Sequence, residues 1–150
     1  SVVKSVIKSN ENRSKILLDR IYRMLNKKLK NKKITSLGAT CKANTDDMRD
    51  SSSLKMIPWL SKKGAIIKYF DPTGYKNEFS KLKNVTNRTS IKDAVQNSDL
   101  VILHTEWNDF KSINFKNLAK GKKFIIFDMR NLYSSSKMKE QGFKYFSVGK

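Results

Sequence analysis

The sequence predicts an α/β protein with a doubly wound, mainly parallel sheet, preceded by one long N-terminal helix. Short apolar runs alternate along the chain with stretches of helical periodicity, which is typical of such sheets. The runs are apolar throughout instead of alternating with polar residues, as expected of parallel strands buried on both faces. Gly64 and Gly142 each stand between a helical stretch and an apolar run, where helix C-caps belong.

The first element is a helix predicted over residues 2–30. Apolar residues recur there at three- and four-residue steps, with a polar interruption at 9–13. These apolar residues are Val2, Val3, Val6, Ile7, Leu17, Ile21, Met24, Leu25 and Leu29. A helix of this length, about 45 Å, overhangs a domain of this size. We therefore expect residues 1–31 to form a connecting helix that packs on a missing domain or on a second copy, as in a homodimer.

Residues 32–150 are predicted to form the sheet domain. The predicted strands are 34–39, 65–70, 100–103, 124–127 and 144–148, with a short extra strand at 84–86. The predicted helices are 52–63 after a serine cap, 75–82, 91–97, 115–119 and 135–141. Pro58 is expected to kink the first of these helices.

Composition limits the possible functions. The chain carries 32 Lys+Arg against 13 Asp+Glu, a net charge of +19 that would attract any polyanion. The lysines are spread over every segment, however, so we do not favour a nucleic-acid partner; a phosphate-bearing substrate accounts for part of the charge. One cysteine and one histidine argue against disulfides and a metal site and fit a cytoplasmic protein. No apolar stretch is long enough for a membrane span, and no signal peptide is recognisable.

A ligand is expected beyond the carboxyl ends of the strands, where the strand order reverses. With an order 3-2-1-4-5-6, this point lies between the strands at 34–39 and 100–103. Lys42 and Arg130 follow strands two spacings apart, roughly 10 Å, and can reach a common point. Two converging cations suit a pyrophosphate or a carboxylate, although solvated surface charges remain the alternative.

A dinucleotide-binding domain is the competing interpretation. Asp71 stands where a ribose-binding carboxylate would be, but the first turn keeps only Gly38 of the G-x-G-x-x-G pattern. The sequence thus predicts a related sheet that does not bind a dinucleotide in the usual way. Asp71 followed by Pro72 reads more simply as a turn.

The segment from Cys41 to Ser51 resembles the F-K-P-N-T-D-D-x-R-x-S signature of the UDP-glucose 6-dehydrogenases. The similarity continues through Tyr69–Pro72, Thr105–Phe110 and Phe127–Asn131, and through the tail 142–149. The opening helix resembles the helix that joins the two domains of that family and forms its dimer core. The resemblance covers essentially the whole chain, in order.

The resemblance implies a C-terminal, Rossmann-like UDP-sugar-binding domain of an NAD-dependent enzyme that converts UDP-glucose to UDP-glucuronate. By motif position, Lys42, Arg130 and the backbone of Cys41 would bind substrate, and Arg49 would reach towards NAD. NAD and the catalytic cysteine belong to the family's N-terminal domain, so we expect no catalysis by these residues alone, and a separate N-terminal chain is one possible partner. Sister enzymes act on UDP-N-acetylmannosamine or GDP-mannose; Thr105-Glu106-Trp107 favours UDP-glucose.

Three positions depart from the family pattern. Cys41 replaces an aromatic residue, Ala43 a proline and Met129 a glycine. No general base flanks Cys41, so we interpret it as a small packed side chain and not as a catalytic thiol. For His104 and Glu106 we expect turn and packing roles. A scaffold without a ligand, or a basic nucleic-acid-binding module, remain the alternative functions.

Overall fold

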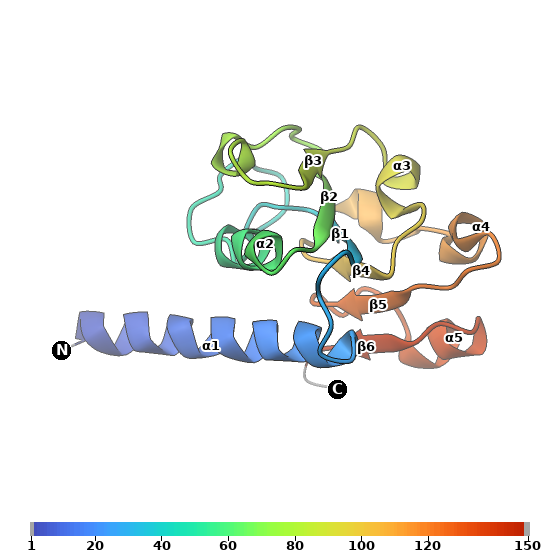
Figure 1. The fold of residues 1–150 in the computed structure, drawn as a ribbon, viewed down its shortest axis with the longest axis horizontal. Helices are drawn as coiled ribbons and strands as arrows, with labels where there is room; N and C mark the ends of the chain where they lie inside the picture. Colours follow the sequence, from blue (N-terminus) through green and yellow to red (C-terminus); the bar gives the residue numbers. More distant parts are fainter. Residues whose placement is uncertain (1, 149–150) are drawn as a thin grey trace.

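The sheet has six strands, and all of them are parallel. The computed structural model describes residues 2–148, with side chains from residue 11 onward. The strands are β1 (Lys33–Leu37), β2 (Ile66–Phe70), β3 (Val85–Asn87), β4 (Leu100–Leu103), β5 (Ile125–Asp128) and β6 (Tyr145–Ser147). Their order is β3-β2-β1-β4-β5-β6 (Figure 1). This confirms the predicted fold class and places the reversal of strand order between β1 and β4.

Helices cover both faces of the sheet. They are α1 (Val2–Met24), α2 (Ser53–Lys62), α3 (Ile91–Val95), α4 (Phe115–Ala119) and α5 (Ser135–Glu140), with short 3-10 helices η1 (Asn77–Phe79) and η2 (Asn108–Phe110). One core cluster joins α1, α2 and η1 to the sheet through residues such as Ile21, Ile57 and Phe79. The other joins α3, α4 and α5 through Val95, Phe115 and Met138. The strands at the centre of the sheet are therefore covered on both sides, which explains their continuous apolar character.

The long N-terminal helix is present, but it ends six residues before the predicted end. α1 stops at Met24, and Asn26 and Lys27 then take left-handed φ values of 56° and 61°. Leu25 and Leu29 are nevertheless buried in the core. The apolar spacing thus continues through a turn that is not helical, which is why periodicity alone overextended the helix. The side chains of Val2, Val3, Val6 and Ile7 lie outside the described ones.

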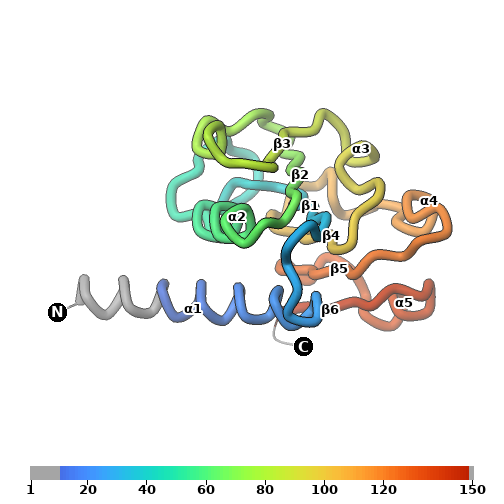
Figure 2. Tube along the Cα trace, in the orientation of Figure 1, coloured from blue at the N-terminus to red at the C-terminus, as the bar shows by residue number. Residues whose placement is uncertain are grey.

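Among the described side chains of α1, those of its C-terminal part pack on the sheet domain. The Arg20 guanidinium lies over the Phe127 ring, 4.8 Å from its centroid, and donates a 3.2 Å hydrogen bond to the Ser147 carbonyl. Ile16, one turn earlier, leaves 63 % of its surface exposed. The coloured part of α1 in Figure 2 accordingly runs along the β6 edge and continues past the sheet. No helix in the described range, residues 2–148, is both long and apolar enough to cross a membrane.

Two further predictions need correction. The helix predicted over 75–82 is only the three-residue η1, because Lys76 is extended and donates its amide to the Tyr69 hydroxyl at 2.9 Å. Ser52 precedes α2 as predicted, but its side chain does not cap the helix. Pro58 lies inside α2, and the other predicted strands and helices are present with ends shifted by two residues at most.

Candidate functional site

The predicted ligand site is formed where β1, β4 and β5 end at one edge of the sheet. Leu37, Leu103 and Asp128 are in register across these three strands. The chain therefore leaves β1, β4 and β5 side by side at the reversal of strand order. Since the loops that carry the family motif follow these strand ends, the topology brings them together.

Asp71, at the end of β2, holds the backbone of the loop that follows β1. Its Oδ2 accepts from the amides of Ala39 at 2.8 Å and Thr40 at 3.3 Å. Its Oδ1 accepts from the Thr73 amide at 2.9 Å and the Thr73 hydroxyl at 2.5 Å, which confirms the turn predicted at Asp71-Pro72. The buried Lys76 ammonium lies 3.9 Å away. A buried carboxylate thus satisfies the first free amides after β1.

These contacts bear on whether the β1 turn fits a dinucleotide. In dinucleotide-binding sheets, amides after the first strand donate to the pyrophosphate. Here the amides of Ala39 and Thr40 already donate to Asp71. A β-carbon on Gly38, the one remaining glycine of the pattern, would lie 2.4 Å from the Thr105 Oγ1. The side chain of Thr105 therefore lies against the turn, and two of the amides that would face a pyrophosphate are already occupied.

Three hydroxyl groups hold the carbonyls of the same loop. Ser51 and Ser53 both donate to the Ala39 carbonyl, at 2.6 and 2.5 Å. Thr105, which follows β4, donates to the Thr40 carbonyl at 2.7 Å. The loop is therefore tied to its own continuation and to the neighbouring strand. This explains the two serines: they satisfy a carbonyl that would otherwise be buried without a partner.

Arg130 completes this set from the end of β5. Its Nε donates to the His104 carbonyl at 3.0 Å and its Nη2 to the Cys41 carbonyl at 2.5 Å. The guanidinium thus bridges the loops after β1 and β4, directly at the reversal of strand order. The Asp128 side chain accepts the Arg130 amide at 3.1 Å, which fixes the turn that presents the arginine even though Met129 stands in it.

Lys42 and Arg49 are both exposed, in contrast to Arg130. The Lys42 ammonium makes no hydrogen bond or ion pair among the described residues. Arg49 pairs with Asp47 at 2.8 Å while 87 % of its side chain stays exposed. Hydrogen bonds from Arg49 lower the pKa of Asp47 to about 2. The structure thus places Lys42, Arg130 and the half-buried Cys41 at the same strand edge, whereas the meeting of the two cations over one anion stays a prediction.

His104 is fully buried behind Arg130. Its Nε2 shares a 2.8 Å hydrogen bond with the Ser52 hydroxyl, and its Nδ1 a 2.9 Å hydrogen bond with the Thr105 hydroxyl. Burial, together with the Arg130 charge, lowers the pKa of His104 to about 4. A neutral imidazole with both nitrogens occupied fits the packing role expected from the sequence. Glu106 is exposed, beyond this network.

Sequence reasoning missed the network behind the site. Asp71, Ser51, Ser53 and Thr105 hold the backbone of the loop after β1, but none of them was predicted to do so. The sequence offered part of the evidence for this network. Asp71 follows β2 next to that loop, and three consecutive serines stand at the end of the loop. Within residues 11–148 no group of three or more His, Cys, Asp or Glu side chains could hold a metal ion.

Comparisons with known proteins agree with this geometry. Residues 35–135 match the model of the UDP-binding domain of the UDP-glucose/GDP-mannose dehydrogenase family. The UDP-glucose 6-dehydrogenase of Rickettsia felis is 38 % identical over 99 % of this chain, which spans 34 % of that protein. The enzyme YwqF of Bacillus subtilis, with the same name, is 33 % identical over 99 % of the chain and 34 % of its own length. The chain therefore spans about a third of the length of the curated relatives it matches.

Solved structures show the same fold. The UDP-glucose dehydrogenase of Pyrobaculum islandicum has a TM-score of 0.72 at 20 % identity, over 97 % of this chain and 31 % of that one. The NDP-N-acetyl-D-galactosaminuronic acid dehydrogenase of Methanosarcina mazei has a TM-score of 0.74 at 22 % identity, over 93 % of this chain and 29 % of that one. In both cases the similar region is again about a third of the known protein.

Proposed function

Because the chain belongs to the UDP-glucose/GDP-mannose dehydrogenase family, as its UDP-binding domain, we propose that it binds the nucleotide sugar of a UDP-glucose 6-dehydrogenase. Such an enzyme oxidises UDP-glucose to UDP-glucuronate with NAD. We assign NAD and the catalytic cysteine to the two thirds of the relatives that the chain does not match. This assignment is supported by the β1 turn, whose amides donate to Asp71 instead of being free for a pyrophosphate.

The position of Arg130 is the observation that carries this proposal. Its guanidinium lies between the loops after β1 and β4, and its Nη1 makes no hydrogen bond among the described residues. A fixed guanidinium with a free edge suits a phosphate or a carboxylate. Lys42, exposed and without an ion pair in the described part, adds a mobile cation from the neighbouring loop. Arg49 would extend towards NAD, with Asp47 orienting its side chain.

Calorimetric titration with UDP-glucose and UDP-glucuronate tests this assignment. Arg130→Ala and Lys42→Ala should each weaken binding at least tenfold, or about 1.4 kcal/mol. Lys111→Ala is the matched control, because it removes an equal charge from an exposed position on another loop. GDP-mannose and UDP-N-acetylmannosamine should bind more weakly than UDP-glucose.

Since Arg130 also ties two carbonyls together, its variant is first checked for folding by circular dichroism. Lys42→Ala removes no hydrogen bond or ion pair among the described residues, so it keeps the test valid if Arg130→Ala unfolds. Equal affinity of the unmodified protein and both variants would refute the site. An equal loss of affinity in all three variants would show that binding depends only on the overall charge of the protein.

For assembly, we propose a homodimer paired through α1. The support is the helix that runs past the sheet and leaves Ile16 exposed. Ile16→Glu should shift sedimentation towards the monomer, whereas Asn12→Glu, with the same change in charge at an exposed position, should not. An unmodified protein that stays monomeric at high concentration would contradict the dimer. The single free cysteine supports a cytoplasmic location.

A further inference from the structure

The fold gathers twelve of the 26 lysines at one edge of the sheet. In a parallel sheet every loop that enters a strand lies at the amino edge, and every loop that leaves one lies at the carboxyl edge. The entering loops contain twelve lysines and one carboxylate, Asp99. These loops, which we call the amino edge, are residues 25–33, 63–65, 80–84, 96–99, 120–124 and 141–144.

The carboxyl edge, where the nucleotide-sugar site lies, is electrically balanced. The loops that leave the strands carry six basic and six acidic side chains. They are residues 38–52, 71–76, 88–90, 104–114 and 129–134. The excess positive charge therefore lies at the amino edge and not at the loops around the substrate site. The strands β1, β2, β4 and β5, of four or five residues each, separate the two edges, which lie about 15 Å apart.

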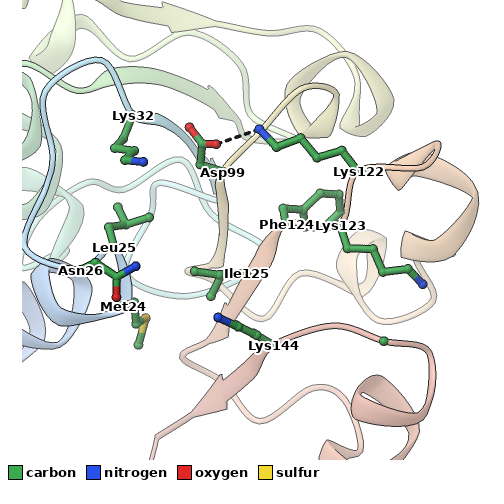
Figure 3. A pocket seen from close by; sticks show the side chains of 11 residues that line it. Met24, Leu25, Asn26, Lys32, Asp99, Lys122, Lys123, Phe124, Ile125 and Lys144 are labelled. Carbon is green, nitrogen blue, oxygen red and sulfur yellow. Dashed lines mark hydrogen bonds and ion pairs between the residues drawn. The ribbon is translucent and has the colours of Figure 1, made fainter.

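A pocket of about 310 Å³ opens in the amino edge. It lies between the end of α1 and the starts of β1, β4, β5 and β6 (Figure 3). Leu25, Phe124 and Ile125 form apolar parts of its wall, and four lysines line it. A second pocket, of about 260 Å³, adjoins it and shares Lys122 and Phe124.

Three of the four lysines come from different loops and point towards the hollow. Figure 3 shows the ammonium groups of Lys32, Lys122 and Lys144 facing inward. The fourth, Lys123, points away: its ammonium donates to the Gln141 carbonyl and lies 5.2 Å from the centroid of the Phe143 ring.

The one carboxylate in the pocket is already neutralised by the protein. Asp99 pairs with Lys122 at 3.0 Å and accepts the Lys33 amide at 2.8 Å. These contacts lower the pKa of Asp99 although burial opposes the shift. Among the described residues, the ammonium groups of Lys32 and Lys144 make no hydrogen bond or ion pair, so they are available to an external anion.

We propose that this pocket binds a small anion that carries two or more phosphate groups, independently of the nucleotide-sugar site. Its volume lies in the range of small-molecule sites. Two ammonium groups that are unpaired among the described residues, those of Lys32 and Lys144, face the pocket from different loops beside the Lys122–Asp99 pair. Two separated cations suit phosphates spaced along a short chain better than a single carboxylate. The aromatic residues of the amino edge, Phe124 and Phe143, are buried and cannot stack on bases, which disfavours a nucleic-acid strand as the occupant.

Calorimetry with tripolyphosphate at about 150 mM salt tests the proposal, since such salt screens exposed charges beyond about 8 Å. We expect saturable binding that weakens at least tenfold in the double variant Lys32→Gln/Lys144→Gln. The control, Lys111→Gln/Lys137→Gln, removes the same charge from exposed positions outside the pocket and should change binding less than twofold. All four side chains are on the surface and outside the core, so both variants should fold.

Three outcomes would overturn the proposal. They are no saturable binding at this salt concentration, equal weakening in the two double variants, and binding of duplex DNA without binding of tripolyphosphate. UDP-glucose titrated into Lys32→Gln/Lys144→Gln separates this proposal from the substrate assignment. Unchanged UDP-glucose affinity supports two independent sites, and a loss matching that of tripolyphosphate contradicts them.

Discussion

Acidification should destabilise this protein through its single histidine, before most carboxylates titrate. His104 has a pKa of about 4 in the folded protein against an ordinary value of 6.5, because it is fully buried beside Arg130. The unfolded chain therefore takes up a proton at a higher pH than the folded one. The stabilisation is complete above pH 6.5 and is lost as the pH falls from 6.5 towards 4.

The expected loss follows from these two values. At about pH 4.5 an unfolded histidine is almost fully protonated while His104 in the fold is still mostly neutral. The linkage relation then gives a decrease on the order of 2 kcal/mol in the free energy of unfolding relative to pH 7. This is a large part of the stability of an ordinary domain.

Urea denaturation at pH 7 and at about pH 4.5 measures this loss. His104→Gln keeps a hydrogen-bonding group near Ser52 but cannot be protonated, so its loss of stability on acidification should be smaller by roughly 2 kcal/mol. The carboxylates, including Asp47 and Asp99 with their lowered pKa values, are common to both proteins and cancel in the difference. Since the chain has one histidine, its imidazole proton resonance reports the folded pKa directly. A resonance that titrates near 6.5, or equal losses in both proteins, would refute the reasoning.

Two further substitutions test other parts of the structure by thermal or urea unfolding. Gly38→Ala should cost about 2 kcal/mol or more, since φ is +91° and the added β-carbon would lie 2.4 Å from Thr105 Oγ1. Gly74→Ala, with φ +89° and no atom within 4 Å, should cost only about 1 kcal/mol, and equal costs would show that the contact with Thr105 does not matter. Arg20→Ala should destabilise the packing of α1 by about 1 kcal/mol, because it loses a ring contact and a hydrogen bond. Arg23→Ala, which loses only an exposed pair with Asp19, should lower the stability less than Arg20→Ala does, and the reverse order would contradict the contact of Arg20 with the sheet.

The sheet could be predicted from the sequence because its signals are local. Each central strand is a continuous apolar run, and Gly64 and Gly142 mark helix ends with φ values near +90°. The strand order was assumed from a common doubly wound arrangement, which the alternation of strands and helices allows but does not determine. The end of α1 could not be read in this way, because Leu25 and Leu29 keep helical spacing while Asn26 and Lys27 turn the chain.

The site was predictable to the level of the strand ends but not of the contacts. Arg130 was expected to face a ligand, and it does lie at the reversal of strand order. Its nitrogens also donate to two loop carbonyls, and this depends on loop geometry that no local sequence pattern encodes. The clustering of lysines was missed for a similar reason. Lysines spread evenly along the sequence come together once every entering loop reaches the same edge.

The carboxylate of Asp71 has a consequence for the energetics of ligand binding. Because it takes up the amides of Ala39 and Thr40 permanently, the loop reaches its final shape during folding and needs no nucleotide to order it. A ligand arriving at the strand ends therefore meets a preorganised surface, and little of its binding energy is spent on conformational entropy.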